Sequence, residues 1–293
     1  MRLRSVLKWL LIAVGGVLGI ALLGATTVYV LIGIDLDRTF DGAGASVYIP
    51  DDKASVAEGE RLARLRGCNG GCHGDTVNGA LFFDAPDGTR VVAPDLGRAV
   101  RNFSIEELER VIRHGIRPDG TSVIALMPSS MFYHLSDHDL GAIIAFLKTQ
   151  APGNEQLPVT KFGPLGRLLL FYFKQSEGTI LAAEIIDHGA ARLNPATSDI
   201  SAHGRYLAMT VCTECHGEDL RGFPDESIPT LAVVAGYSIE EFRKLMRKGE
   251  PIGGRTFNLM AEVAKSRFSH FSDPEIISLH AYLQTLASTE PDT

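Results

Sequence analysis

The four cysteines of this 293-residue chain form two closely spaced pairs, and a histidine directly follows each pair. In the first motif three residues separate the cysteines, and in the second motif two residues do. The chemically reactive positions are Cys68, Cys72 and His73 in the first motif, and Cys212, Cys215 and His216 in the second. Few other patterns constrain a fold as strongly, because each motif fixes two thiols and one imidazole within a single turn of chain.

This pattern is typical of covalent attachment of c-type haem. Two thiols add to the two vinyl groups of the porphyrin, and the adjacent imidazole reaches the iron from one face. The second motif has the regular spacing. In the first motif, Gly70 and Gly71 permit backbone angles that are closed to other residues, so we expect the extra residue to bulge out there. The sequence predicts two haem c groups.

Three other uses of four cysteines remain as alternatives: a zinc site, a disulfide pair and a thioredoxin-like redox motif. Four thiolates satisfy zinc by number alone, but zinc gives no reason for a histidine after each pair. Thioredoxin-type pairs do not need that histidine either.

The N-terminus carries a long apolar run. No charge except Lys8 lies between Val6 and Gly33, and the run from Trp9 to Ile32 is long enough to cross a bilayer of about 30 Å as a helix. Basic residues precede the run and acidic residues follow it, which predicts a cytoplasmic N-terminus and an exported remainder. A cleavable signal peptide is the alternative, although its apolar core is usually about 7–15 residues and ends in a small-residue cleavage site. We therefore expect a single-pass anchor in the bacterial inner membrane, with the haem domains in the periplasm. That compartment is oxidising towards cysteine thiols.

The charge balance excludes one class of partner. Three of the 28 basic residues, Arg2, Arg4 and Lys8, lie in the apolar N-terminal segment, and none of the 35 acidic residues does. The exported part is therefore acidic, and nucleic-acid binding, which needs a basic surface, is not expected. An acidic surface is compatible with a basic redox partner and equally with ordinary solubility.

The exported part contains an internal repeat. Residues 103–107 (FSIEE) recur as 237–241 (YSIEE), and residues 132–137 (FYHLSD) recur as 268–273 (FSHFSD). Each copy holds the same helix-opening signals, capping boxes at Ser104 and Glu107 and at Ser238 and Glu241. Apolar residues recur at helical spacing and few alternate as in strands, so two tandem all-α domains are predicted.

The arrangement resembles class I cytochrome c domains over most of the exported chain. In that family an N-terminal helix carrying a glycine crosses a C-terminal helix carrying an aromatic residue before a leucine. Glycine lets the ring lie against the crossing backbone. The matching residues are Gly59 with Phe146-Leu147, and Gly204 with Tyr282-Leu283. An unrelated helical core that uses the same residues is the alternative.

The resemblance implies a methionine as the sixth iron ligand in each copy, which raises the reduction potential. Met127, in Leu126-Met127-Pro128, matches the methionine-proline loop of the family, and Met131 is its rival. Met260 holds the comparable position in the second copy, although no proline follows it. His134, His270 and His280 are alternative ligands, but surface or haem-edge positions suit them better.

The resemblance also assigns a role to two prolines. Pro94 and Pro229 occupy equivalent places and resemble the family proline whose carbonyl accepts the other N–H of the iron-binding histidine. Such a bond orients the ring and makes it a better donor to iron. The alternative is a loop proline that fixes a turn.

The predicted organisation is an anchor at 1–34, a linker at 35–52, cytochrome c domain 1 at 53–150, an interdomain linker at 151–199, cytochrome c domain 2 at 200–288 and a tail at 289–293. The short apolar segment 168–173 cannot span a membrane. We expect it to pack between the domains or, alternatively, to touch the bilayer beside the anchor.

The predicted function is periplasmic electron transfer between redox partner proteins, from a dehydrogenase or quinol-oxidising complex to a terminal acceptor, without catalysis by the chain itself. The alternatives are a dihaem enzyme of the peroxidase or thiosulfate dehydrogenase type, and a cytochrome subunit of a larger respiratory complex.

Overall fold

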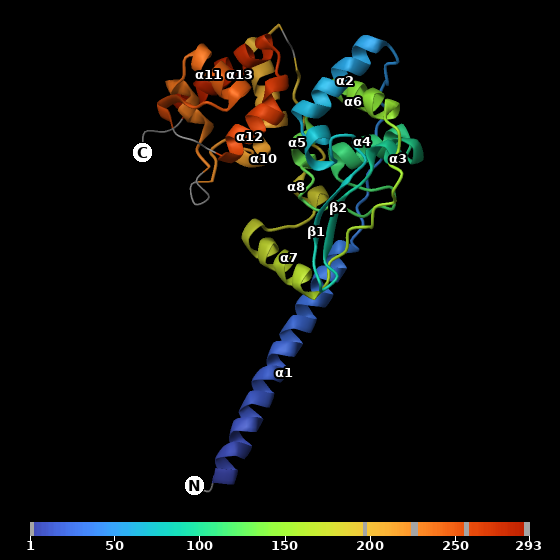
Figure 1. The fold of residues 1–293 in the computed structure, drawn as a ribbon, viewed down its shortest axis with the longest axis vertical. Helices are drawn as coiled ribbons and strands as arrows, with labels where there is room; N and C mark the ends of the chain where they lie inside the picture. The colour runs from blue at the N-terminus through green and yellow to red at the C-terminus, as the bar shows by residue number, and fades with distance from the viewer. Residues whose placement is uncertain (1–2, 196–197, 224–227, 255–257, 290–293) are drawn as a thin grey trace.

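A computed structural model describes residues 3–195, 198–223, 228–254 and 258–289. The chain begins with one long helix, α1 (Leu3–Leu36), which projects away from the globular part (Figure 1). From Ser5 to Leu36 this helix is long and apolar enough to cross a membrane. Arg2, one of the basic residues before the apolar run, and residues 290–293 of the predicted tail lie outside the described part.

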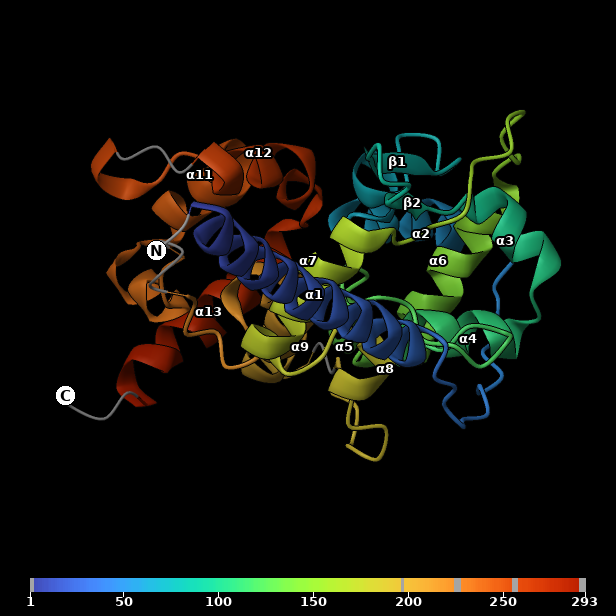
Figure 2. The ribbon, with the colours of Figure 1, turned by 90° about the horizontal axis from the view of Figure 1, so that it is seen from below.

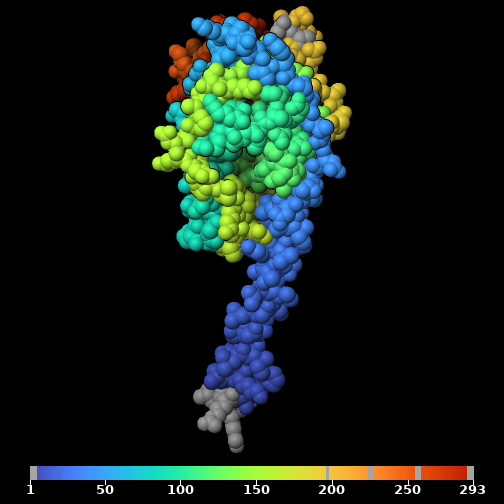
Figure 3. All heavy atoms as spheres, turned by 90° about the vertical axis from the view of Figure 1, so that its right-hand side faces the viewer, coloured from blue at the N-terminus to red at the C-terminus, as the bar shows by residue number. Residues whose placement is uncertain are grey.

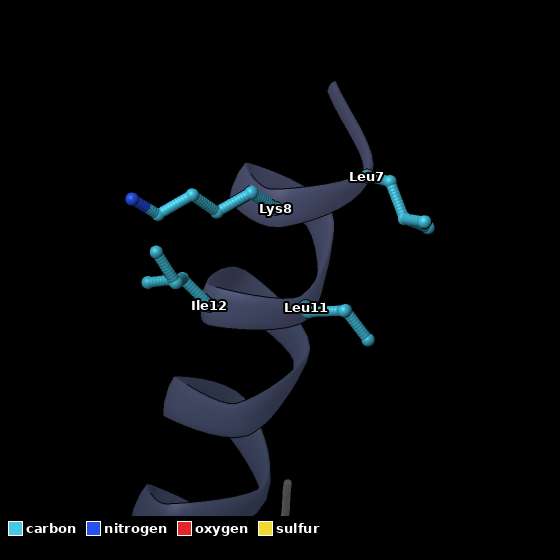
Figure 4. Close-up of a pocket in the computed structure, with 4 residues that line it drawn as sticks. All are labelled: Leu7, Lys8, Leu11 and Ile12. Atoms are coloured by element: carbon cyan, nitrogen blue, oxygen red, sulfur yellow. The ribbon is translucent and has the colours of Figure 1, made fainter. Parts of the chain in front are cut away.

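The apolar side chains in the N-terminal turns of α1 are exposed. Figure 4 shows Leu7 and Leu11 on one side of the helix, with Lys8 and Ile12 on the other. Side chains four residues apart share a helix face. All four are exposed, and only a shallow hollow of the helix surface lies between them. This part of α1 therefore exposes a mainly apolar surface.

A first helical core lies between residues 53 and 150. Its elements are α2 (Lys53–Leu65), the turn η1 (Cys68–Cys72), β1 (Ala80–Asp84), β2 (Arg90–Ala93), α3 (Leu96–Asn102), α4 (Ile105–His114), α5 (Ser129–Tyr133) and α6 (Asp137–Thr149). Helices α2 and α6 cross at Gly59, where a methyl group would overlap the carbonyl oxygen of Ala142. Phe146 packs at this crossing, and its Cβ lies 3.1 Å from the position that a Cβ at Gly59 would take.

A second helical core lies between residues 200 and 289. Its elements are α9 (Ile200–Val211), α10 (Thr213–His216), η3 (Leu231–Gly236), α11 (Ile239–Lys248), η4 (Ile252–Gly254), α12 (Asn258–Ser266), η5 (Phe268–His270) and α13 (Asp273–Thr289). Helices α9 and α13 cross at Gly204. A Cβ there would overlap the carbonyl oxygen of Ser278 and lie 2.6 Å from the Cβ of Tyr282. Both cores thus use a glycine and an aromatic residue at a helix crossing.

The helix-opening signals form as expected. Ser104 and Glu107 make a reciprocal capping box at the start of α4, and Ser238 and Glu241 make the equivalent one at the start of α11. Each box satisfies two backbone N–H groups that the first turn of a helix leaves unpaired. Both helices end at a glycine in the left-handed region, Gly115 and Gly249.

The first core departs from the all-α expectation. Strands β1 and β2 form an antiparallel hairpin with an irregularity between Leu81 and Phe83. Asp87-Gly88 lies at its turn, and Gly88 has a φ of 85°. Apart from isolated β-bridges, the rest of the described secondary structure is helical.

The segment between the cores contains α7 (Pro164–Glu177) and α8 (Ala182–Ile185). The structure does not place the apolar segment 168–173 between the cores. Its residues Leu170 and Phe171 pack instead against a small buried cluster that includes Ile32 of α1. Figure 2 shows α7 next to α1. Helix α7 therefore lies beside α1, at the point where α1 leaves the globular part.

Buried polar contacts join the two cores. The side chain of Arg66 is fully buried, and its Nη2 lies 3.1 Å from Oδ2 of Asp139 in the first core and 3.4 Å from Oγ1 of Thr210 in the second. The hydroxyl of Tyr206 donates to the same Asp139 oxygen at 2.7 Å. Burial raises the pKa of Tyr206 to about 12, so this hydroxyl stays protonated. The charge pair of Arg66 and Asp139 lies within the first core, and the hydrogen bonds with Thr210 and Tyr206 connect it to the second core.

Candidate haem-binding site

The first cysteine motif directly follows α2. Gly67, with a φ of 76°, turns the chain out of the helix, and Gly70 adopts a φ of 68° inside the motif. The backbone N–H of His73 donates to the carbonyl of Cys68 at 3.2 Å, which closes a turn over five residues. In the second motif, His216 donates to Cys212 at 3.0 Å, over four residues. The wider turn takes up the extra spacer residue, and Gly70 supplies the left-handed angle that it needs.

The histidine of each motif has one ring nitrogen engaged by a proline carbonyl. Nδ1 of His73 lies 2.8 Å from the carbonyl oxygen of Pro94, and Nδ1 of His216 lies 3.0 Å from that of Pro229. Burial lowers the pKa of both imidazoles, although the proline carbonyls act in the opposite direction. Both rings are therefore neutral near pH 7 with the proton on Nδ1, which leaves Nε2 as the nitrogen that can bind a metal.

The four thiols are free and partly buried. Burial raises the pKa of Cys68 to about 11 and that of Cys212 to about 12. Burial also raises the pKa of Cys72 and Cys215. Each motif thus offers two free thiols and one neutral imidazole within a short turn, and this donor set fits a haem c attached through two thioethers with a histidine on the iron.

Arg267 lies between the two motifs. Its Nη1 pairs with Oε2 of Glu214, inside the second motif, at 2.8 Å. Its Nε lies 3.4 Å from the carbonyl oxygen of Leu65, at the end of α2, and its guanidinium carbon lies 3.0 Å from the place where a Cβ on Gly67 would be. The charge of Arg267 also acts on all four thiols, where it offsets part of the effect of burial on their pKa. One arginine therefore contacts both the second motif and the chain just before the first motif.

Sequence reasoning did not single out Arg66 or Arg267. Each is one basic residue in an otherwise ordinary helical context, and only the packing of one core on the other gives it a place. Leu65 shows the same effect, because it belongs to α2 but is buried within the second hydrophobic core.

The methionines predicted as ligands lie on the cores that carry the motifs. Met127 precedes α5, is partly buried and packs against the first core, whereas Met131 lies within α5 and is almost fully buried. Met260, in α12, is partly buried and packs against the second core. The choice between Met127 and Met131 stays a prediction.

The alternative histidines differ in their surroundings. His280 is buried, and its Nε2 lies 2.8 Å from the carbonyl oxygen of Tyr237, so a structural contact already engages it. His134 lines a cleft of about 190 Å³ together with Met131 and Met209. Its Nδ1 is buried without a hydrogen-bond partner.

Comparison with known families identifies part of the chain. Residues 201–287 match the family model described as cytochrome c. The chain contains a cytochrome c domain. This domain implies haem c, and the matched region includes Cys212, Cys215 and His216.

Relatives along most of the chain are cytochrome subunits of dehydrogenases. The chain is 23% identical to the fructose dehydrogenase cytochrome subunit of Gluconobacter japonicus, over 89% of this chain and 58% of the relative. It is 25% identical to the cytochrome c subunit of the alcohol dehydrogenase (quinone) of Gluconobacter oxydans, over 80% of this chain and 55% of the relative. It is 22% identical to the gluconate 2-dehydrogenase cytochrome c subunit of Pantoea cypripedii, over 83% of this chain and 62% of the relative. The chain thus spans somewhat more than half the length of these relatives.

Proposed function

We propose that this protein is a membrane-anchored dihaem cytochrome c that carries electrons on the periplasmic side of the bacterial inner membrane. In this proposal residues 53–150 and 200–288 are tandem class I cytochrome c domains, each with one covalent haem. His73 and Met127 bind the first iron, and His216 and Met260 bind the second. Helix α1 spans the membrane with its N-terminus in the cytoplasm.

One recurring piece of geometry carries the proposal. In both cores a cysteine-histidine motif follows a helix that crosses the last helix of the core at a glycine, and the motif histidine is held by a proline carbonyl. The second core lies in the matched cytochrome c region. The same arrangement in the first core supports a second haem, although its motif has an extra residue.

The haem iron, when bound, supplies a change of oxidation state by one electron. The chain's residues set the conditions for that change. Pro94 and Pro229 orient the iron-binding rings through their carbonyl oxygens, and thioether ligands favour the reduced state. Arg267 keeps the two motifs next to each other, which supports electron transfer between the domains.

The relatives suggest the donor. They are cytochrome subunits of sugar, alcohol and gluconate dehydrogenases. We therefore propose that this chain accepts electrons from the catalytic subunit of a membrane-bound dehydrogenase and passes them to a further acceptor in the respiratory chain. The chain spans only part of each relative. Co-purification from detergent-solubilised membranes would identify the dehydrogenase.

The carrier function predicts a specific spectroscopic result. The oxidised full-length protein in detergent should be low-spin at both haems, show a methionine-to-iron charge-transfer band, and turn over neither peroxide nor thiosulfate. Optical and electron paramagnetic resonance spectra with the two activity assays test this. A high-spin haem with an open site, together with peroxide or thiosulfate turnover, would replace the carrier by a dihaem enzyme.

A further inference from the structure

Helix α7 exposes an apolar face. Residues spaced three and four apart along a helix lie on one side of it, and on α7 these are Leu165, Leu168, Leu169, Tyr172 and Phe173. Between 44% and 66% of each of these residues is exposed. A helix that packs on its own protein normally buries such a stripe against the core. On α7 the apolar stripe is exposed instead.

The opposite face of α7 is fixed against α1. The guanidinium of Arg167 donates to the backbone carbonyl of Tyr29 at 2.7 Å and stacks over the ring of Tyr29 at 3.9 Å. Lys174 pairs with Asp35 at 2.5 Å. These contacts use the basic side chains of α7 to hold the helix beside the last turns of α1, and they direct the apolar stripe away from the protein.

The hairpin extends the same surface. Asp87, in its turn, accepts the backbone N–H of Leu165 at 2.8 Å, and the buried hydroxyl of Thr89 accepts the N–H groups of Gly163 and Gly166, each at 3.1 Å. The hairpin turn therefore caps the start of α7. Strand β1 adds three half-exposed residues, Leu81, Phe82 and Phe83. In Figures 1 and 3 the hairpin and the start of α7 form the end of the globular part from which α1 emerges.

In the proposed membrane span, the position of the outer membrane surface follows from the number of residues needed for the crossing. A helix needs about 20 residues to cross a hydrocarbon core of about 30 Å. Counted from Lys8, the last charge before the apolar run, the crossing ends near Val28. Tyr29 and Ile32, which contact α7, therefore lie in the headgroup layer, where aromatic residues are enriched in membrane proteins. The start of the apolar stripe lies beside this level, since Arg167 contacts Tyr29, and its end lies farther along α1, since Lys174 contacts Asp35.

We propose that α7 and strand β1 form a second membrane contact, which lies on the outer leaflet of the bilayer that α1 crosses. The occupant of the exposed apolar stripe is lipid, at the boundary between headgroups and acyl chains, where the apolar faces of amphipathic helices bind. This contact stops the globular part from pivoting about α1 and holds the haem-bearing cores at one orientation to the membrane. It rests on the membrane span in the proposed function.

Site-specific photocrosslinking of the full-length haem-loaded protein tests this contact. Leu169→p-benzoylphenylalanine and Tyr172→p-benzoylphenylalanine introduce the photoreactive group on the exposed face of α7, where neither side chain supports the core. The matched controls are the same substitution at Ile277, an exposed apolar residue of α13 in the second core, and at Ile20, in the middle of α1. Each variant is irradiated in vesicles of phosphatidylcholine and phosphatidylglycerol, and adducts are identified by intact mass.

We expect phospholipid adducts at positions 20, 169 and 172, and none above background at 277. Adducts at position 20 without adducts at 169 and 172 would overturn the α7 contact and leave the membrane span intact. Crosslinks from 169 or 172 to a second copy of the chain would overturn it in favour of a protein interface. Absence of lipid adducts at all positions would remove both the span and the α7 contact.

Discussion

Replacing Gly204 by alanine is expected to destabilise the second helical core by about 3 kcal/mol, at the upper end of the range for overpacked cores. The added methyl group would overlap the carbonyl oxygen of Ser278 and approach the Cβ of Tyr282, and neither atom can move without shifting α13. Helix propensity acts the other way, since alanine is favoured over glycine by about 1 kcal/mol inside a helix. A loss of unfolding free energy would therefore indicate overpacking at the crossing, and a gain would indicate that helix propensity dominates.

Denaturant unfolding of the full-length protein in detergent, followed by circular dichroism, measures this change. Gly236→Ala is the matched control, because nothing lies within 4 Å of a Cβ at that position. We expect that variant to stay within about 0.5 kcal/mol of the wild type, as exposed substitutions usually do. Equal or greater stability of Gly204→Ala would show that the crossing of α9 and α13 is looser than described.

The second large effect concerns the methionines. Met127→Leu and Met260→Leu should each lower the potential of one haem by on the order of 100 mV or more, since axial ligands set haem potentials over a range of about 0.8 V. Leucine keeps the volume and removes the thioether, so packing changes little. Because each methionine packs on a different core, each substitution should leave the other haem unchanged. Spectroelectrochemical titration measures both potentials.

Met131→Leu is the control for this experiment. Met131 is almost fully buried in the first core, only four residues from Met127, and we expect its replacement to leave both potentials and the charge-transfer band in place. If Met131→Leu abolished the signal of the first haem while Met127→Leu did not, the ligand would be Met131. If none of the three substitutions changed either haem, methionine ligation would be wrong, and a histidine such as His134 or an open site would take its place.

Local signals in the sequence were enough for much of the fold. Capping boxes depend on residues three apart, and Ser104 and Ser238 form them as expected. The crossings at Gly59 and Gly204 also appear as expected, because only glycine admits the close approach of two backbones there. The β-hairpin had a local signal too, since Asp87-Gly88 between two apolar runs is a typical hairpin turn. The helical periodicity of the rest of the chain led to an all-α prediction that left this hairpin out.

Features that depend on contacts between distant residues were not predictable. The place of α7 beside α1 depends on Arg167 meeting Tyr29 and on Lys174 meeting Asp35, pairs separated by about 140 residues. Arg267 lies between the cysteine motifs only because the two cores pack together. No periodicity or short motif marks such residues, so the sequence predicted a haem for each motif but not how near the two motifs lie.

The number of covalent haems per chain tests the central claim most directly. Pyridine haemochrome analysis and intact mass of the purified native protein should give two haems for each polypeptide, with no thiol left free at Cys68, Cys72, Cys212 or Cys215. A single haem, with Cys68 and Cys72 free or joined in a disulfide, would show that the longer first motif is not loaded and would reduce the protein to a monohaem cytochrome.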